Sequence, residues 1–535
     1  MELLEKYFEI AINTPDGITR LRELILKLAI RGSLTIQDKN ELSGDKLLGE
    51  IQLEKKSLFK QGRIKKQIYF DNKNNPIRPF IIPDNWIWTS LNNIVSLLGD
   101  GIHGTPQYDN HGEYYFINGN NLTDGRIEIK SNTKTITEKE FQKHKRDLTV
   151  NTVLVSINGT LGNVAFYDNE KVILGKSACY FNLMHGINKH YIKYIIKSNY
   201  FKDYAFTNAT GSTIKNVSLK SMRELPIPLP PKEEQNRVVL KIEELMNLCD
   251  QLEKQRDSKS DILSKINNSA IDKLIKAEGE IALIEAATFI NDKFGELYST
   301  NSNLEGLKKA ILNIGISGRF KIDAKTSKHE NQYPSIPNSE EPFKLPVNWI
   351  WTKLDNLGET QTGTTPPKKN PEYYGNYIPF LGPGDIKDFK IDYTNNGLSE
   401  LGLEKARFIA ANSILMVCIG GSIGKMAIND RDVTCNQQVN TITPYDGVHL
   451  KYLSAVLQSD YFQTKILANA GGSATPIINK GKWISIPIPL PPLDIQIEIS
   501  DKIEKLLSLC NSLENSIGQV SKKQVQILNS VLANI

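Results

Sequence analysis

The chain has 535 residues, of which 40% are hydrophobic and 23% are charged, so it can form at least two domains with ordinary cores. Its net charge of +5 permits a nucleic-acid partner without requiring one, and no apolar run reaches the roughly eighteen residues that a membrane span needs. Five cysteines without a C-x-x-C pair, and an acidic start where a signal peptide would be basic, favour a reducing cytoplasm over a secreted, disulfide-bonded or zinc-binding class.

The first 82 residues are expected to form a helical region and a linker. The segment "ITRLRELILKLAIRGSL", Ile18 to Leu34, has the apolar spacing of a helix and a glycine near its end. A segment with the same pattern, "LEGLKKAILNIGISGRF", follows at Leu304 to Phe320. It predicts a second leading helix and linker over residues 286–345.

Residues 83–231 and 346–492 are expected to form two mixed α/β domains. They open on nearly the same phrase, "PDNWIWTSL" and "PVNWIWTKL", and close on "LPIPLPP" and "IPIPLPP". Apolar runs such as "NTVLVSI" and "NSILMVCI" predict strands that end at glycine turns. Tryptophans that alternate at period two in each opening phrase favour a core role on a strand, and the proline runs favour a strand-to-helix joint. The chain is therefore a tandem duplication, with a shift of 261 residues from Pro226 to Pro487.

Two long helices are predicted after the proline runs, over residues 232–285 and 493–535. Their apolar residues step by four and three, as in a coiled coil, and we expect the helices to pair as a rod of roughly 60 Å. The alternative is that each helix lies separately on its own domain. Arg256 and Lys259 interrupt the pattern, as solvated or register-setting residues, with a DNA-facing role as the lesser alternative. The predicted seam consists of Val238, Ile242, Leu245, Leu252, Leu263, Ile266, Ile499, Ile503, Leu506, Leu513, Ile517, Val520 and Ile527.

Three motifs that resemble enzyme motifs are incomplete. "FLGPGD", Phe380 to Asp385, fits an adenosylmethionine-binding loop, but the chain lacks the catalytic tetrapeptide that accompanies such loops. "LGKS", Leu174 to Ser177, ends like a phosphate-binding loop, but Glu170 stands where that loop needs glycine. Glu128 to Lys130 could be the tail of a nuclease metal site, yet the second copy has no lysine at the equivalent place. We expect no catalytic residue, no metal site and no cofactor bound by this chain.

Polar, glycine-bearing loops in both domains carry the groups that a DNA duplex reader needs. Amide side chains pair with adenine edges, lysine with guanine, and glycine turns allow close approach to phosphates. Ordinary surface turns remain the alternative for any single loop. The candidate DNA-binding residues are His103, Thr105, Gln107, Asn118, Asn120, Asn121, Asn158, Thr160, Lys176, Ser212, Thr213, Lys215, Thr362, Thr364, Thr365, Lys368, Lys369, Asp385, Lys387, Ser422, Lys425, Asn436, Gln437, Gln438, Ser473 and Thr475.

Taken together, the doubled "NWIW" phrase, the G-T-x-P loops, the "GTLG" and "GSIG" turns and the "PIPLPP" exits resemble the specificity subunit of type I restriction-modification systems. The resemblance covers nearly the whole chain. It implies an α+β fold in which two mixed α/β target-recognition domains in tandem are separated by a pair of long antiparallel coiled-coil helices. The first copy departs from the family pattern at "GNNLTDG" and "KSACYFN".

The same resemblance implies a subunit without catalysis of its own that reads a bipartite, asymmetric site in double-stranded DNA. Two modification subunits would bind S-adenosylmethionine and methylate adenine, and two restriction subunits would use ATP and Mg²⁺. The alternatives are a self-sufficient enzyme that modifies or cleaves DNA around Glu128 to Lys130, and a coiled-coil scaffold that binds no nucleic acid.

Overall fold

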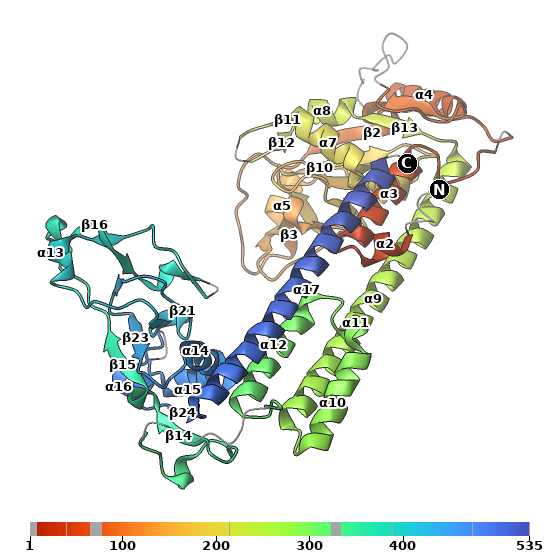
Figure 1. Cartoon of the computed structure of the whole chain (residues 1–535). Coiled ribbons are helices and arrows are strands. Elements are labelled where there is room, and N and C mark those ends of the chain that lie inside the picture. Colours follow the sequence, from red (N-terminus) through yellow and green to blue (C-terminus); the bar gives the residue numbers. More distant parts are fainter. Residues whose placement is uncertain are drawn as a thin grey trace. The chain divides into compact units, whose positions relative to one another are not determined.

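The structure is a computed structural model that describes residues 8–38, 40–64, 78–212, 214–322, 333–387, 389–472 and 475–533. It divides into two compact units, Met1–Ser258 with Lys523–Ile535, and Lys259–Lys522. The long helices α9 (Lys232–Lys276) and α17 (Leu493–Ala533) each contribute residues to both units (Figure 1). No helix among the described residues is long and apolar enough to cross a membrane.

The domain of the first unit is built on a four-stranded antiparallel sheet in the order β2-β10-β7-β8. A second sheet, β6-β3-β9, contains the parallel pair β3 and β9. The strands of these sheets are β2 (Val95–Asp100), β3 (Tyr114–Ile117), β6 (Lys134–Ile136), β7 (Thr152–Ser156), β8 (Val164–Phe166), β9 (Val172–Leu174) and β10 (Ala178–Leu183). The helices of the domain are α5 (Glu138–His144), α6 (Lys189–Lys197), α7 (Asn199–Asn208) and α8 (Leu219–Glu224).

The domain of the second unit repeats this topology, with sheets β15-β23-β20-β21 and β19-β16-β22. Their strands are β15 (Gly358–Thr362), β16 (Tyr374–Leu381), β19 (Gly397–Leu398), β20 (Ile414–Val417), β21 (Met426–Ile428), β22 (Thr434–Cys435) and β23 (Val439–Pro444). The helices of the domain are α13 (Glu400–Leu403), α14 (Leu450–Gln458), α15 (Asp460–Asn469) and α16 (Lys480–Ile484). Two-stranded pairs complete the two domains: β4 (Leu122–Thr123) with β5 (Arg126–Ile127), β11 (Ala209–Thr210) with β12 (Asn216–Val217), and β17 (Ile386–Lys387) with β18 (Lys390–Ile391). The predicted duplication and the mixed α/β class of both domains are confirmed.

The tryptophan phrases form strands that pair with the proline runs. In the first domain β1 (Ile87–Ser90) is antiparallel to β13 (Pro226–Leu229), so that Trp88 stands opposite Pro228. In the second, β14 (Ile350–Lys353) pairs with β24 (Pro487–Leu490), and Trp351 stands opposite Pro489. All four tryptophans of the two phrases are buried, which confirms their predicted core role. The proline runs are more than joints, because they form an edge strand where proline is tolerated.

A glycine in the left-handed region links each leading helix to the phrase that follows. Gly32 and Gly318 both have φ of +69°, directly after α3 (Gly17–Ile30) and α12 (Asn301–Ile316). A Cβ atom on either glycine would lie 2.4 Å from the Cγ atom of Pro83 or Pro346, the first residue of the phrase. The helix end and the phrase therefore recur together because they pack together.

The two long helices meet the leading helices at opposite ends. In the first unit Val238 and Ile242, near the start of α9, share a core with Leu528, near the end of α17. In the second unit Ile271 and Leu274, near the end of α9, share a core with Leu304 of α12 and, at its margin, Leu513 of α17. The beginning of one long helix and the end of the other thus belong to the same unit in both units. This is the arrangement of an antiparallel pair.

The predicted seam is only partly buried. Val238, Ile242, Ile499 and Ile503 are buried, and Leu245, Leu252, Leu263, Leu513 and Ile517 are half-buried. Leu506, Ile266, Ile527 and Val520 are exposed to 36%, 39%, 38% and 54%, whereas Leu528, outside the seam, is buried. The reason is that α3 and α12 join the bundle as a third helix and shift the buried stripe, which a two-helix pattern does not anticipate.

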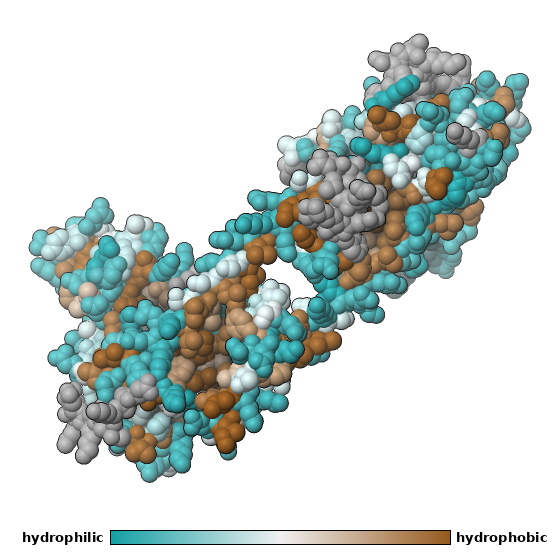
Figure 2. All heavy atoms as spheres, turned by 45° about the vertical axis from the view of Figure 1, so that its right-hand side comes forward, coloured by the Kyte–Doolittle hydropathy of each residue, from teal (hydrophilic) through white to brown (hydrophobic). Residues whose placement is uncertain are grey.

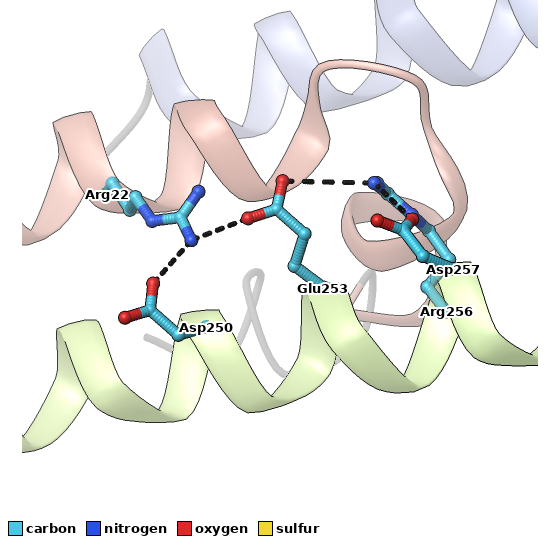
Figure 3. A network of polar contacts seen from close by, with 5 residues as sticks. All are labelled: Arg22, Asp250, Glu253, Arg256 and Asp257. Atoms are coloured by element: carbon cyan, nitrogen blue, oxygen red, sulfur yellow. Dashed lines mark hydrogen bonds and ion pairs between the residues drawn. The ribbon is translucent and has the colours of Figure 1, made fainter.

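Arg256 belongs to a network of charges in the first unit rather than to an apolar seam (Figure 3). Arg22 of α3 forms ion pairs with Asp250 at 2.6 Å and Glu253 at 2.8 Å on α9. Arg256 pairs with the neighbouring Asp257 at 3.0 Å. In the second unit Lys308 of α12 pairs with Glu514 of α17 at 2.8 Å, at the place equivalent to Arg22 and Glu253. Each leading helix is thus tied to a long helix by a matching ion pair.

Among the described residues, two further α-helices precede each domain in its own unit. In the first unit α2 (Phe8–Asn13) comes before α3, and α4 (Gly44–Lys60) lies between α3 and β1. In the second unit α10 (Glu280–Asp292) and α11 (Phe294–Leu297) come before α12, and α10 exposes Ile281 and Ile284 to 76% and 55%. Figure 2 shows that apolar side chains gather in patches on a largely polar surface. A cavity of about 650 Å³ lies between α10, α12 and α17, with Leu283, Ile311 and Leu509 among its lining residues.

Candidate nucleic-acid interface

The candidate loops of the second domain leave the four-stranded sheet at one edge. Thr362 ends β15 opposite Asn440, near the start of β23, and Val417 ends β20 opposite Val439. The turns of residues 363–370, 418–425 and 436–438 therefore emerge side by side. We call them the second loop edge.

The first domain has the same edge. Cys179 of β10 stands opposite Asp100, the last residue of β2, and Ala178 stands opposite Ser156, the last residue of β7. The turns of residues 101–107, 157–163 and 175–177 form what we call the first loop edge. Loops predicted separately from the sequence are thus gathered at one end of each sheet.

Within each loop edge, two turns are pressed together at a glycine. A Cβ atom on Gly101 would lie 2.0 Å from the carbonyl oxygen of Leu174, and one on Gly363 would lie 2.3 Å from that of Cys435. The next residue donates its N–H to the same carbonyl, at 2.8 Å in the first domain and 2.9 Å in the second. This contact places His103 where Thr365 stands, whereas the shared letters of "HGTP", His103 to Pro106, and "TGTTP", Thr362 to Pro366, would align His103 with Thr362.

A second glycine brings a more distant segment to each edge. Gly159 and Gly420 have φ of +73° and +79°. Gly159 donates its N–H to the Lys215 carbonyl oxygen at 3.0 Å, and Gly420 donates to that of Pro476 at 2.8 Å. The segments that contain Lys215 and Thr475 therefore belong to the two loop edges. The candidates Thr213 and Ser473 lie outside the described residues.

In each domain, the residue after β3 or β16 faces the residue after β9 or β22 across a small space, and an asparagine on one side fills it. In the first domain Asn118 stands against Gly175, whose Cβ atom would lie 2.1 Å from the Asn118 Oδ1 atom. In the second domain the equivalent positions are Gly382 and Asn436, and a Cβ atom on Gly382 would lie 3.0 Å from the Asn436 Nδ2 atom. One asparagine and one glycine are present in both cases. The asparagine follows β3 in the first domain but follows β22, on the other side of the space, in the second.

Two of the candidate DNA-binding residues form hydrogen bonds within their own loops instead of facing solvent. Asn121 and Asp385, equivalent in the two domains, are buried, with exposures of 5% and 6%. The Asn121 amide donates to the Glu128 carbonyl oxygen at 3.0 Å and to the Thr133 hydroxyl at 3.2 Å. The Asp385 carboxylate accepts from Gly382 N–H and from the Asn395 amide, both at 2.7 Å. These bonds stabilise the turn that follows β3 or β16.

Most of the other candidates are open to solvent. The exposed ones are His103, Thr105, Gln107, Asn120, Thr160, Lys176, Ser212, Lys368, Lys369, Lys387, Lys425, Gln437 and Thr475. The half-buried ones are Asn118, Asn158, Lys215, Thr362, Thr364, Thr365, Ser422, Asn436 and Gln438. His103 forms a pair with Asp100 at 2.8 Å, and Asn158 donates to the Asn216 side chain at 3.1 Å.

The sequence interpretation missed one pair of arginines. Arg146 donates from Nε to the carbonyl oxygen of Asp100 at 3.1 Å, and Arg407 donates from Nη1 to that of Thr362 at 2.6 Å. Both acceptors are the last residue of a strand at a loop edge. The signal was present, because the two arginines are separated by the same shift as the proline runs. A guanidinium at this place adds positive charge to each edge, as phosphate binding requires.

Comparison with known proteins decides the family. Residues 83–259 and 346–520 match the family described as "Type I restriction modification DNA specificity domain". The chain belongs to this family. The resemblance inferred from the motifs is confirmed, and the chain is a type I specificity subunit with two DNA specificity domains in tandem.

Individual relatives agree in length as well as in name. The chain is 24% identical to the "Type I restriction enzyme EcoEI specificity subunit" of Escherichia coli over 567 residues, which cover 96% of this chain and 93% of that protein. It is 25% identical to the EcoAI specificity subunit of Escherichia coli over 582 residues, with the same coverage. A solved structure described as "Structural basis underlying complex assembly and conformational transition of the type I R-M system" matches with a TM-score of 0.51 at 16% identity, covering 85% of this chain and 98% of that one. This last likeness supports the fold.

Proposed function

We propose that the chain reads a bipartite, asymmetric site in double-stranded DNA, one half with each loop edge, and performs no catalysis itself. The observation that carries this proposal is the convergence of the candidate turns at one end of each four-stranded sheet, beside Arg146 or Arg407. Such an edge combines a backbone fixed by hydrogen bonds with exposed amide, hydroxyl and lysine side chains. These are the groups that contact bases and phosphates.

The asymmetry of the site follows from the unequal loops. The two edges share their glycine contacts but not their exposed side chains: the second carries Lys368 and Lys369 in a turn where the first has "HGTPQ". Equivalent frames with different side chains select different bases. Each wrong base pair costs roughly 1–3 kcal/mol, so two half-sites together give a discrimination that one domain cannot.

Two modification subunits and two restriction subunits are the proposed partners, in the cytoplasm. S-adenosylmethionine, ATP and Mg²⁺ would be used by these subunits, not by this chain. The support for helical docking is the apolar surface of the second unit, where Ile281 of α10 and Leu509 of α17 are exposed to 76% and 60%. Leu509 also lines the apolar cavity between α10, α12 and α17, and contiguous apolar surface of this kind is typical of an interface.

No observation favours a self-sufficient DNA enzyme. The Glu128 carboxylate accepts from the Thr123 hydroxyl at 3.1 Å and lies 3.7 Å from the Lys130 Nζ atom, which itself donates to the Asn120 carbonyl oxygen. Within the described ranges no three histidine, cysteine, aspartate or glutamate side chains are grouped to hold a metal ion.

An exchange of domains tests the proposal. Residues 346–492 are replaced by the matching domain of a relative, and the methylated sites of the chimera and its parent are mapped after co-expression with the modification subunit. One half-site should change and the other should stay. A change in both, or in neither, contradicts independent reading. DNA methylated or cleaved by the purified chain alone, with S-adenosylmethionine and Mg²⁺ present, would contradict the absence of catalysis, and failure to bind DNA with the modification subunit present would favour a scaffold.

A further inference from the structure

One turn in each domain connects the two sheets at the loop edge. In the first domain residues 175–177 join β9 of the three-stranded sheet to β10 of the four-stranded sheet. In the second, residues 436–438 join β22 to β23 in the same way. The middle residues of these turns, Lys176 and Gln437, are equivalent.

The residues on both sides of Lys176 are fixed. Gly175 donates its N–H to the Ile117 carbonyl oxygen at 2.8 Å, and the Ser177 carbonyl oxygen accepts from the Ile157 N–H at 3.0 Å. The Ser177 hydroxyl also donates to the Asn118 Oδ1 atom at 3.0 Å and accepts from Gly119 N–H at 2.9 Å. Lys176 itself is exposed and forms no hydrogen bond or ion pair with the described residues.

Gln437 has the same setting. Asn436 donates its N–H to the Leu381 carbonyl oxygen at 2.9 Å, and the Gln438 carbonyl oxygen accepts from Cys418 N–H at 2.8 Å. Gln437 is exposed, and its side-chain oxygen accepts a hydrogen bond from the Thr365 hydroxyl. That bond orients the amide and leaves its NH₂ group and one lone pair of its oxygen for a ligand.

An exposed side chain on a backbone that is held from both sheets is suited to reading a base, because the fixed backbone sets the position from which the side chain reaches its ligand. Lysine in the major groove pairs with the O6 and N7 acceptors of guanine. Glutamine pairs with adenine, accepting from N6 and donating to N7. Exchange between these two residue types at one position therefore changes the base that is preferred.

We propose that this position is a specificity determinant in each domain, with Lys176 selecting guanine in one half-site and Gln437 selecting adenine in the other. The inference rests on the proposed function, since it assumes that the loop edges face the major groove. Thr365 is a positioning residue for the Gln437 amide. In the first domain His103 stands at the equivalent place but pairs with Asp100, so Lys176 has no such partner.

The test uses the full chain in complex with its modification subunit and a duplex library with randomised positions, from which bound sequences are selected and read. Lys176→Gln should change one position of one half-site from guanine to adenine. Gln437→Lys should change one position of the other half-site from adenine to guanine. Each preference should shift by roughly tenfold or more, and all other positions should stay as in the parent.

Matched variants separate base reading from charge and from folding. Lys56→Gln removes an exposed lysine on α4, outside the loop edge, and should leave the selected sequence unchanged. Thr365→Val keeps the shape of the side chain but loses the hydroxyl, and should weaken the preference for adenine at the Gln437 position alone.

Three outcomes would overturn the inference. Lys176→Gln could leave the selected base unchanged, or it could weaken binding equally for all sequences with a salt slope smaller by about one charge, which is the signature of a phosphate contact. Gln437→Lys could leave its half-site unchanged. A parent complex that selects no sequence at all would instead contradict the proposed function, so the two failures are distinguishable.

Discussion

Asn118 and Asn436 fill the same space from opposite sides, one after β3 of the first domain and the other before β23 of the second. Each faces a glycine on the other side of the space, Gly175 and Gly382. The arrangement shows that the distance between these two segments is kept in both domains although the residue that spans it has moved. The framework of the loop edge is thus conserved within the chain more closely than its sequence.

The exchange can be reproduced by mutation. Gly175→Asn alone places a second side chain in a filled space and should destabilise the first domain by about 1–3 kcal/mol, as overpacking does. Combined with Asn118→Gly it recreates the arrangement of the second domain and should recover most of the loss. Denaturation of the single and double variants measures this. A double variant as unstable as the single one would mean that the two spaces are not equivalent.

Trp351→Ala should destabilise the second unit by about 3–5 kcal/mol, because it removes a large side chain that is only 2% exposed. Its indole N–H also donates to the Phe343 carbonyl oxygen at 3.0 Å, which would lose that bond. Hydrogen exchange should show loss of protection in the second unit and native protection in the first. Normal stability with lost DNA binding would instead make the tryptophan a contact residue.

The ion pairs between leading and long helices should contribute little but equally. Arg22 and Glu253 are 27% and 38% exposed, and Lys308 and Glu514 are 19% and 39% exposed, so solvent screens both pairs. We expect a coupling energy of about 0.5 kcal/mol in each double-mutant cycle, falling with added salt. Coupling of several kcal/mol, or none without salt, would contradict this interpretation of the two pairs.

Stability should depend on pH through Lys55 of α4. Burial lowers the pKa of Lys55 to about 8 from an ordinary value of 10.5, and its Nζ atom donates to the Asn92 carbonyl oxygen at 2.8 Å. Between these two pH values the folded chain binds fewer protons than the unfolded chain, so the free energy of unfolding rises with pH, by up to about 3 kcal/mol. This gain is complete above the ordinary pKa of 10.5 and is lost as the pH falls to about 8.

Lys55→Met should remove this rise, whereas Lys56→Met, at the exposed neighbouring position, should keep it. Urea denaturation at about pH 7.5 and about pH 9.5 compares the three proteins. The same pH dependence in Lys55→Met as in the parent would show that other groups cause it.

Lys368→Ala and Lys369→Ala should weaken DNA binding across all sequences. Both side chains are exposed in the turn after β15, and we expect each ammonium group to contact a phosphate rather than a base. The slope of binding against salt should decrease by about one charge for each lysine that is removed. Binding titrations at several salt concentrations measure this, on DNA with and without the selected site. Weaker binding to one sequence alone would assign the lysine to a base instead.

Much of the architecture was predictable because the sequence motifs that mark it occur in both copies of the repeat. The tryptophan phrase, the proline run and the terminal glycine recur at fixed spacing, and each proved to be part of one packed junction, as with Gly32 against Pro83. The helical seam was less predictable. A heptad pattern describes two helices only. In the structure Leu528 is buried in one core with residues of α3, whereas Ile527 is exposed. The helix α3 lies hundreds of residues away from both in sequence, so the pattern does not anticipate it.

The loop edges were predictable in composition but not in detail. Asn121 and Asp385 look like surface polar residues in the sequence, and only the turn geometry shows that they are buried caps. The same holds for His103: its G-T-P neighbours would align it with Thr362, whereas the close approach of Gly101 to Leu174 makes it equivalent to Thr365. Short-range patterns do not encode such contacts between strands that are distant in sequence.

The pairing of β1 with β13, and of β14 with β24, means that the chain enters and leaves each domain through adjacent strands. The two ends of a domain that is closed in this way lie side by side, next to the helices that precede and follow it. Insertions or deletions inside it, such as the additional glycine at Gly421, change the length of the domain without moving the strands at which the chain enters and leaves. Selection can therefore vary these domains in length and sequence while the long helices keep their register.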